Sequence, residues 1–451
     1  MWVHVLNSPL DSWNQSLVRI EIWINCLTNN MQDWREILDQ TVDQQVPELV
    51  QLRRHLHMYP ELSGQEYEST RYLVQWLEAN GIDAEVGPDA RGVIANLNRK
   101  ESLDAAGLFA LRADMDALAI QDSKSVKYGS RHPGVMHACG HDAHTAMVAG
   151  ALTAISSLHA AGHLSCDLAV RGIFQPAEET SEGAMHMINA GALANVDAIC
   201  ASHVDPSRVV GKIGLRYGLL TANCDEICVS IRGEGGHSAR PHQTRDPVSA
   251  AAQLINTVYL NIPRNTDSQD AVVVTFCAIR GGQNSNVIPD HVDLKGTLRT
   301  LDPVVRDATM AVLQRLAESV GAVSQTEISL DFSAGSGAVR NDIGISDIIM
   351  SEAKSCLGSS SIERIPRPSM GSEDYAFFTD RIPGAMFRLG CVSTEDQRRG
   401  LHTSSFDVDE RCLAIGAKLL ARTAVSWLYR RQNEDSSSEI HAREEIRSTD
   451  E

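Results

Sequence analysis

Residues 135–144 read VMHACGHDAH and hold five side chains of the kinds that bind or orient metal ions. These are His137, Cys139, His141, Asp142 and His144. A thiolate and an imidazole two positions apart suit a borderline-soft divalent cation such as zinc. Asp142 and His144 open the apolar run that follows, from where they could orient the ligands. A plainer interpretation is a polar loop that caps the Ala-rich run 146–158, so other motifs must decide.

Three predicted apolar strands around this stretch, at 108–112, 168–174 and 196–202, each end in acidic or imidazole side chains. In chain order these are Asp114, Asp116, Glu178, Glu179 and His203. Sites in open α/β sheets gather at the carboxyl ends of the strands. Chance clustering is the alternative, but the pattern favours an α/β sheet with one functional edge.

The motif QPAEE places two adjacent carboxylates, Glu178 and Glu179, at a strand end. Neighbouring side chains on a strand point to opposite sides. One carboxylate could therefore bind a metal while the other reaches the water that the metal activates, as two-metal hydrolases require. The alternative is an exposed acidic turn.

Two further histidines complete a possible ligand set. His203 ends an apolar strand and His402 lies in GLHTSSFDVDE. A lone histidine is more often structural than a ligand. With Cys139, His141 and Glu179, however, they make five ligands of mixed softness, enough for two ions about 3.5–4 Å apart.

Residues 219–335 differ from the segments on either side. Predicted strands and helices alternate there as β-α-β-β-α-β, at 224–232, 246–260, 271–279, 292–299, 304–320 and 327–332. That order is the ferredoxin-like signature. We therefore predict a lid or dimerisation domain at 219–335, inserted into a catalytic domain that comprises 31–218 and 336–430.

Composition limits the class of protein. The 451 residues include 40 basic and 58 acidic residues, a net charge of −18, which argues against nucleic acid as a partner. No apolar run reaches the roughly 18–20 residues that span a bilayer, and no secretory signal is recognisable. Ten cysteines without CxxC pairs favour a reducing, cytoplasmic location. Residues 1–30 are expected to be a loose extension, and 431–451 a disordered acidic tail.

Nine stretches together resemble the co-catalytic metal amidohydrolases of the aminoacylase–carboxypeptidase family. They are RRHLHMYPELS, ALRADMDAL, HACGHDAH, QPAEE, GGHSARPH, NVIPD, GTLRT, GSEDYAFF and LHTSSFDVDE. They recur in order between about residues 34 and 429. The branch they resemble is that of hippurate hydrolases and plant auxin–amino-acid conjugate hydrolases.

The resemblance implies a metallopeptidase-like catalytic domain, with a central mixed sheet flanked by helices, and hydrolysis of N-acyl amino acids. It implies two divalent ions per subunit (zinc, manganese or cobalt), held by Cys139, His141, Glu179, His203 and His402. Glu178 corresponds to the general base. We then expect four further residues to orient these ligands through hydrogen bonds without binding the metal, namely Asp114, Asp116, Asp142 and His144.

In the inserted domain, His237 of GGHSARPH resembles the histidine that polarises the scissile carbonyl. Asn286 and Arg299 match positions that bind the polar end of the substrate. A capped loop histidine and a surface arginine are the plainer interpretations. The wider family pairs this domain into a homodimer and passes its histidine to the partner's metal site, so we expect a possible homodimer here.

Two other functions remain open. A dipeptidase or metallocarboxypeptidase would share the chemistry and differ only in its pocket. A catalytically dead scaffold would have lost the base or a ligand, yet Glu178 and all five candidate ligands are present. We expect a small-molecule substrate and neither a nucleic acid nor a membrane as partner.

Overall fold

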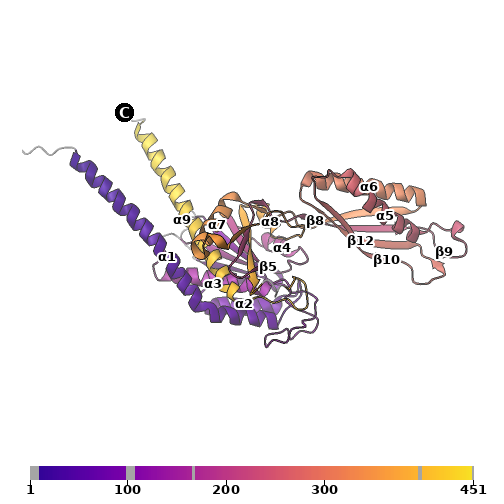
Figure 1. The fold of residues 1–451 in the computed structure, drawn as a ribbon, viewed down its shortest axis with the longest axis horizontal. Coiled ribbons are helices and arrows are strands. Elements are labelled where there is room, and N and C mark those ends of the chain that lie inside the picture. Colours follow the sequence, from indigo (N-terminus) through magenta and orange to yellow (C-terminus); the bar gives the residue numbers. More distant parts are fainter. Residues whose placement is uncertain (1–9, 98–106, 165–167, 395–398, 449–451) are drawn as a thin grey trace, which may run out of the picture.

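The computed structural model describes residues 10–97, 107–164, 168–394 and 399–448 (Figure 1). For 10–33 and 434–448 it describes the backbone alone. The chain builds two units that stand side by side in Figure 1, a larger α/β unit and a smaller one formed by a central segment.

The larger unit is organised around an eight-stranded mixed sheet with the order β1-β2-β4-β3-β5-β16-β6-β15. Its strands are β1 (Asp83–Val86), β2 (Val93–Leu97), β3 (Phe109–Asp114), β4 (Val170–Gln175), β5 (Ala198–Val209), β6 (Ile213–Leu215), β15 (Ile362–Arg364) and β16 (Gly384–Val392). The four central strands β4, β3, β5 and β16 are parallel, whereas β2 and β6 pair with this group antiparallel. This is the central mixed sheet that the sequence predicted.

Helices cover both faces of this sheet. One face is covered by α1 (Leu10–Met58), α2 (Tyr67–Ala79), α3 (His141–Ala160), α7 (Ile343–Leu357) and α9 (Arg411–Ser448), the other by α4 (Gly183–Asn189) and α8 (Ala376–Thr379). Side chains of strand β3 pack against both sets of helices. Phe109 and Leu111 pack on the face covered by α1, α3 and α9, and Ala110 packs on the face covered by α4 and α8. A parallel strand covered on both faces is apolar throughout rather than alternating.

The terminal helices are longer than the sequence predicted. The backbone of residues 10–30 continues α1, and that of 431–448 continues α9, so neither range matches the loose extension or the disordered tail. No glycine or proline lies between residues 10 and 46, or between 431 and 448, to end either helix. Residues 1–9 and 449–451 of those two expectations lie outside the described residues.

The smaller unit is a four-stranded antiparallel sheet, β10-β12-β8-β13, with two helices on one face. Its elements are, in chain order, β8 (Asn223–Arg232), α5 (Pro247–Asn265), β10 (Val272–Arg280), β12 (His291–Thr300), α6 (Pro303–Ser324) and β13 (Glu327–Ala334). Asp-Pro starts both helices, because the Asp246 and Asp302 carboxylates each accept two backbone N–H groups of the first turn. The order agrees with the ferredoxin-like pattern expected for 219–335.

Two short pairings mark the ends of this unit. Strands β7 (Gly218–Leu219) and β14 (Arg340–Asn341) pair where the chain leaves and re-enters the larger unit. Strands β9 (Gly236–His237) and β11 (Val287–Ile288) pair at the opposite end. Figure 1 labels β9 at the tip that points away from the larger unit.

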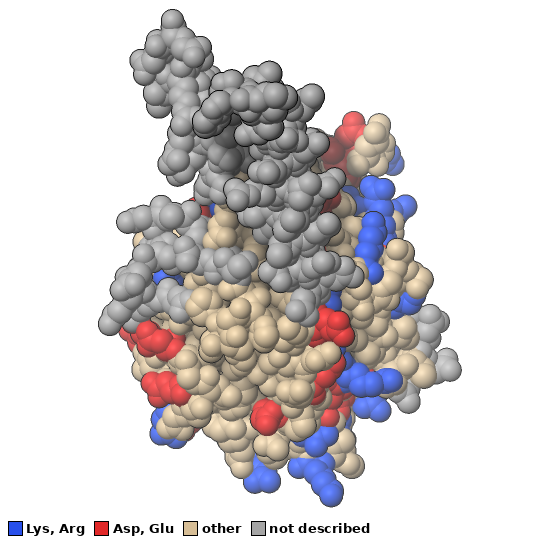
Figure 2. Space-filling model, turned by 90° about the vertical axis from the view of Figure 1, so that its left-hand side faces the viewer, with Lys and Arg blue, Asp and Glu red and all other residues tan. Residues whose placement is uncertain are grey.

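Among the described residues, no helix combines the length and apolar character needed to cross a membrane. The face seen in Figure 2 carries acidic and basic side chains interspersed with uncharged ones. No broad basic surface is visible among the described residues on that face.

Candidate metal centre and active site

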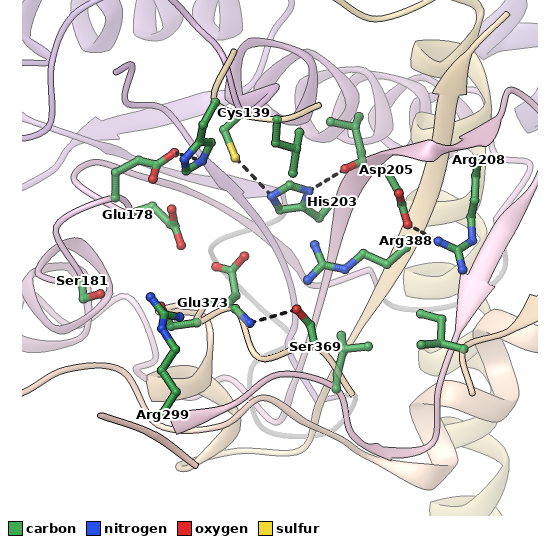
Figure 3. Close-up of a pocket in the computed structure, with 18 of the residues that line it drawn as sticks. Cys139, Glu178, Ser181, His203, Asp205, Arg208, Arg299, Ser369, Glu373 and Arg388 are labelled. Carbon is green, nitrogen blue, oxygen red and sulfur yellow. Dashed lines mark hydrogen bonds and ion pairs between the residues drawn. The ribbon is translucent and has the colours of Figure 1, made fainter. Parts of the chain in front are cut away.

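A cavity of about 680 Å³ opens beside the carboxyl ends of the central strands (Figure 3). Six of the side chains predicted for the site line it, namely Cys139, Glu178, Glu179, His203, Arg299 and His402. They come from loops and strand ends between Cys139 and His402, so distant parts of the chain meet here. The edge predicted from the strand ends is therefore present as one cavity.

Four of the predicted ligands meet around Cys139. Its Sγ lies 3.5 Å from His203 Nε2, and His402 Nε2 lies 3.3 Å from Glu179 Oε1. One donor atom each from Cys139, Glu179 and His402 falls within a 4.8 Å group. His402 adopts a left-handed backbone (φ 59°), and its N–H donates to Ala138 O at 2.8 Å. Such strain in a non-glycine residue is typical of functional sites.

The fifth predicted ligand, His141, joins this group. Its Nε2 lies 3.9 Å from Glu178 Oε2 and 3.9 Å from Glu179 Oε1. His141 also shares a second 4.8 Å group with Cys139 and His203. All five predicted ligands therefore form one cluster, with Cys139 common to both groups.

Hydrogen bonds orient two of the imidazoles. His141 Nδ1 lies 2.9 Å from the Asp116 carbonyl oxygen and 3.1 Å from its carboxylate. His203 Nδ1 lies 2.7 Å from the Val204 carbonyl oxygen. Because carbonyl oxygens only accept, each ring carries a proton on Nδ1 and directs Nε2 into the cluster.

The donor set fits a divalent cation. Both His141 Nε2 and Glu179 Oε1 are buried and lack a hydrogen-bond partner among the described residues. Burial, and secondarily the Arg388 guanidinium, hold the pKa of His203 well below its usual value, which keeps the ring in its neutral, ligating form. Burial raises the pKa of Cys139 to about 12, so its thiolate needs a cation to stabilise it.

Glu178 lies in a strongly acidic environment. Burial, then the nearby Glu373 and Asp374 carboxylates, raise its pKa well above the usual value. Arg112 holds this group together, with Nη1 3.2 Å from Glu373, Nη2 2.8 Å from Asp374 and Nη1 2.7 Å from Asp114. Arg112, Glu373 and Asp374 were not among the residues predicted for the site, although the adjacent acids of GSEDYAFF were a usable signal.

The supporting residues divide into two groups. Asp114 lies 3.9 Å from His141 Nε2, and the Asp116 carboxylate lies 3.1 Å from Nδ1 of the same ring. Both ring nitrogens of His144 are hydrogen-bonded within the protein. Its Nδ1 lies 2.6 Å from Asp114, and its Nε2 accepts from Val204 N–H at 2.9 Å. Asp142 instead accepts from Arg53 Nε at 2.8 Å, so it ties α1 to α3 and does not contact the cluster.

The three residues expected from the smaller unit separate in the structure. Arg299, near the end of β12, lines the cavity and donates to Met370 O at 3.0 Å. His237 is exposed on β9, where it pairs with Val287, and Asn286 O accepts from Ser238 N–H in the same tip. Figure 1 places that tip away from the larger unit, so His237 and Asn286 do not reach the cavity of their own chain.

Comparisons with known proteins place these features in a family. A model of peptidase family M20/M25/M40 matches residues 110–426. The chain is 38% identical, over 85% of its length and 96% of the relative's, to a Synechocystis protein described as "Probable hydrolase". It is 35% identical to N-acetylcysteine deacetylase of Bacillus subtilis, over 84% of this chain and 96% of that enzyme.

A solved structure shares both fold and sequence with this chain. The crystal structure of a dinuclear metal-binding peptidase of the M20 family from Bacillus subtilis superposes with a TM-score of 0.72 at 32% identity. The match covers 86% of this chain and 99% of that one.

Proposed function

The chain belongs to peptidase family M20/M25/M40 and is a hydrolase of amide bonds, and on that premise we propose that its substrates are N-acyl amino acids. The observation that carries the proposal is the cluster of five donors beside a buried carboxylate, at the floor of a cavity with an arginine on its wall. The similarity to a deacetylase of an N-acyl amino acid supports it. Within the family, the nine motifs favour the hippurate hydrolase and auxin-conjugate hydrolase branch.

In this proposal, Cys139, His141, Glu179, His203 and His402 hold two divalent ions. The mixed set of thiolate, imidazole and carboxylate is compatible with zinc, manganese or cobalt. Ions bound there supply Lewis acidity, which acidifies water and polarises an amide carbonyl oxygen. The dinuclear centre of the similar Bacillus subtilis peptidase supports two ions rather than one.

Glu178 is the proposed general base. Its Oε2 faces His141 at 3.9 Å, so the carboxylate can take a proton from a water in the cluster and hand it to the leaving nitrogen. The neighbouring acids that raise its pKa make it a stronger base than an exposed glutamate. Arg112 keeps Glu373 and Asp374 in place and so maintains that environment.

Arg299 is proposed to bind the free carboxylate next to the cleaved amide. Its guanidinium lies in the cavity, and among the described residues it makes a hydrogen bond only to a carbonyl oxygen, so donors remain for a planar anion.

We further propose that His237 and Asn286 serve the site of a second subunit. Both are exposed at the tip of the smaller unit, away from the cavity of their own chain. A homodimer through this unit would bring each tip to the other chain's cavity, where His237 could stabilise the developing oxyanion.

A dipeptidase or carboxypeptidase is the second candidate. It is favoured by the similarity to a protein described as a peptidase, and the same donors and base would serve it. Only the groups that meet the acyl side of the substrate would differ.

The test is a hydrolysis screen with purified protein of measured metal content. N-acetyl, N-benzoyl and indole-acetyl amino acids are compared with dipeptides and with peptides cleaved from the C-terminus. The proposal requires that N-acyl amino acids be hydrolysed with the highest kcat/KM and that chelation abolish the activity. Faster cleavage of dipeptides would replace it with the second candidate.

A further inference from the structure

A second arginine points into the cavity without a partner of its own. Arg388 lies on β16, half-buried, and Figure 3 shows its guanidinium directed to the space below His203. No described residue forms an ion pair or hydrogen bond with this guanidinium.

The register of the sheet places Arg388 there. In the parallel pair β16–β5, Arg388 is opposite His203. Registered residues on neighbouring strands direct their side chains to the same face. The guanidinium therefore lies beside a ligand of the proposed metal centre because of strand pairing and not through loop flexibility.

Two other arginines nearby already form ion pairs. Arg208 pairs with Asp205 and lies 3.2 Å from Glu363, whereas Arg112 pairs with Asp114, Glu373 and Asp374. Arg367 also lines the cavity, but it is exposed and therefore remains hydrated.

An unpaired, half-buried cation loses part of its hydration, so it is stabilised by any anion that completes its hydrogen bonds. A guanidinium matches the planar fork of a carboxylate. The Ser369 hydroxyl, on the same side of the cavity, accepts from Gly371 N–H and retains its own proton to donate. Figure 3 shows Arg388 and Arg299 on different sides of Glu373, so one carboxylate does not satisfy both.

We propose that Arg388 binds a second carboxylate of the substrate, so that the preferred N-acyl amino acids are dianionic. This rests on the proposed function, in which Arg299 takes the carboxylate next to the amide. The second carboxylate belongs either to an acidic amino-acid side chain or to a dicarboxylic acyl group. Both sources present the same chemistry to Arg388.

Two pairs of nearly isosteric substrates separate these sources. N-acetylglutamate is compared with N-acetylglutamine, and N-succinyl-leucine with N-succinamoyl-leucine, for wild type, Arg388→Gln and Arg388→Lys. We expect wild type to prefer the acid of one pair by about ten- to a hundredfold in kcat/KM, the range for hydrogen bonds to a charged group. The pair that shows the preference identifies the source. The preference should fall to near unity in Arg388→Gln, chiefly through KM, and be partly retained in Arg388→Lys.

Arg364→Gln is the matched control, because it removes the same charge from an exposed residue of β15 that does not line the cavity. It should keep the wild-type ratios. Using a ratio within each variant cancels any loss of folded protein. Equal rates for acid and amide in both wild-type pairs, or a ratio that survives in Arg388→Gln, would overturn the assignment of Arg388. Failure to hydrolyse any N-acyl amino acid would instead refute the proposed function, and the Arg388 assignment with it.

Discussion

At the scale of single residues, the adjacent Glu178 and Glu179 have different surroundings. Glu179 Oε1 approaches His402 at 3.3 Å, whereas Glu178 borders the acidic pair Glu373 and Asp374. One peptide bond thus joins a proposed ligand to a proposed base. Both residues lie in a turn after β4 ends at Gln175, and not in the extended chain that the sequence predicted.

Glu178→Gln should retain both metal ions and lower kcat by about two to four powers of ten, the scale of general acid–base catalysis. Glu179→Ala should lose metal, because it removes a ligand. Activity and metal content are measured on the same samples. Near-normal turnover by fully metallated Glu178→Gln would refute the assignment of the base.

Cys139→Ser should weaken metal binding and remove the thiolate-to-metal absorption of the cobalt-substituted protein. Cys412→Ser is the control, since Cys412 is also buried but does not line the cavity. Unchanged absorption spectra for Cys139→Ser would contradict the proposed ligand.

Amidation of the free carboxylate in a good substrate should remove most of the activity, because Arg299 would face a neutral group. In Arg299→Gln the acid and its amide should become similar in kcat/KM. A comparable rate for both substrates in wild type would exclude this role.

At the scale of elements, Arg53 joins α1, α3 and the loop before α9. Its side chain is fully buried and lies 2.8 Å from Asp142 and 2.7 Å from Asp407. Burial alone would raise the pKa of Asp407, but the Arg53 guanidinium and the Tyr128 hydroxyl hold it below the usual value. This connects the motif RRHLH to the stretch that carries the proposed ligands.

Asp407→Asn should lower the free energy of unfolding at pH 7 by about 1.5–3 kcal/mol, the range for hydrogen bonds to charged groups. The folded pKa lies below the unfolded value of about 3.9, so the stabilisation is present above that value. It is lost as pH falls through the folded pKa, where wild type and variant should converge. Urea denaturation at fixed metal concentration measures both limits.

Asp331→Asn, which changes an exposed carboxyl on β13, serves as the control and should show no deficit at pH 7. A deficit in Asp407→Asn that stays constant down to low pH would argue against the ion pair as its source.

At the scale of the whole molecule, the distance between the tip of the smaller unit and the cavity decides how the site is completed. His237 and Asn286 lie at that tip, whereas Arg299 lies at the cavity. Asn286 and Arg299 are close in sequence, yet they lie at opposite ends of the unit because β12 runs between them.

Mixing inactive His237→Ala with inactive Glu178→Gln should restore activity once subunits exchange. If His237 acts in the partner's site, each heterodimer has one site with both defects and one with neither. Activity is followed together with the molar mass, which confirms exchange. Absence of recovery after confirmed exchange would place His237 in its own site or outside catalysis.

The sequence by itself determined the class of sheet, the order of elements in the inserted unit and the residues of the donor cluster. It could do so because apolar strands, helical periodicity and ligand types are local signals. It predicted residues 10–30 and 431–448 less well. Residues 10–30 matched no recognisable element, and the polar composition of 431–448 suggested disorder, although neither range contains a glycine or proline that would end a helix.

Only the tertiary structure decided which groups face one another. Arg112 reaches Asp374 across 262 positions of sequence. Arg388 lies beside His203 because β16 pairs with β5 in that register, and an arginine among the apolar residues of GAMFRLGCV was the sole sequence signal. A shift of one residue in this pairing would turn the guanidinium to the other face. Register between distant strands is set by packing of the whole sheet, so local sequence patterns do not specify it.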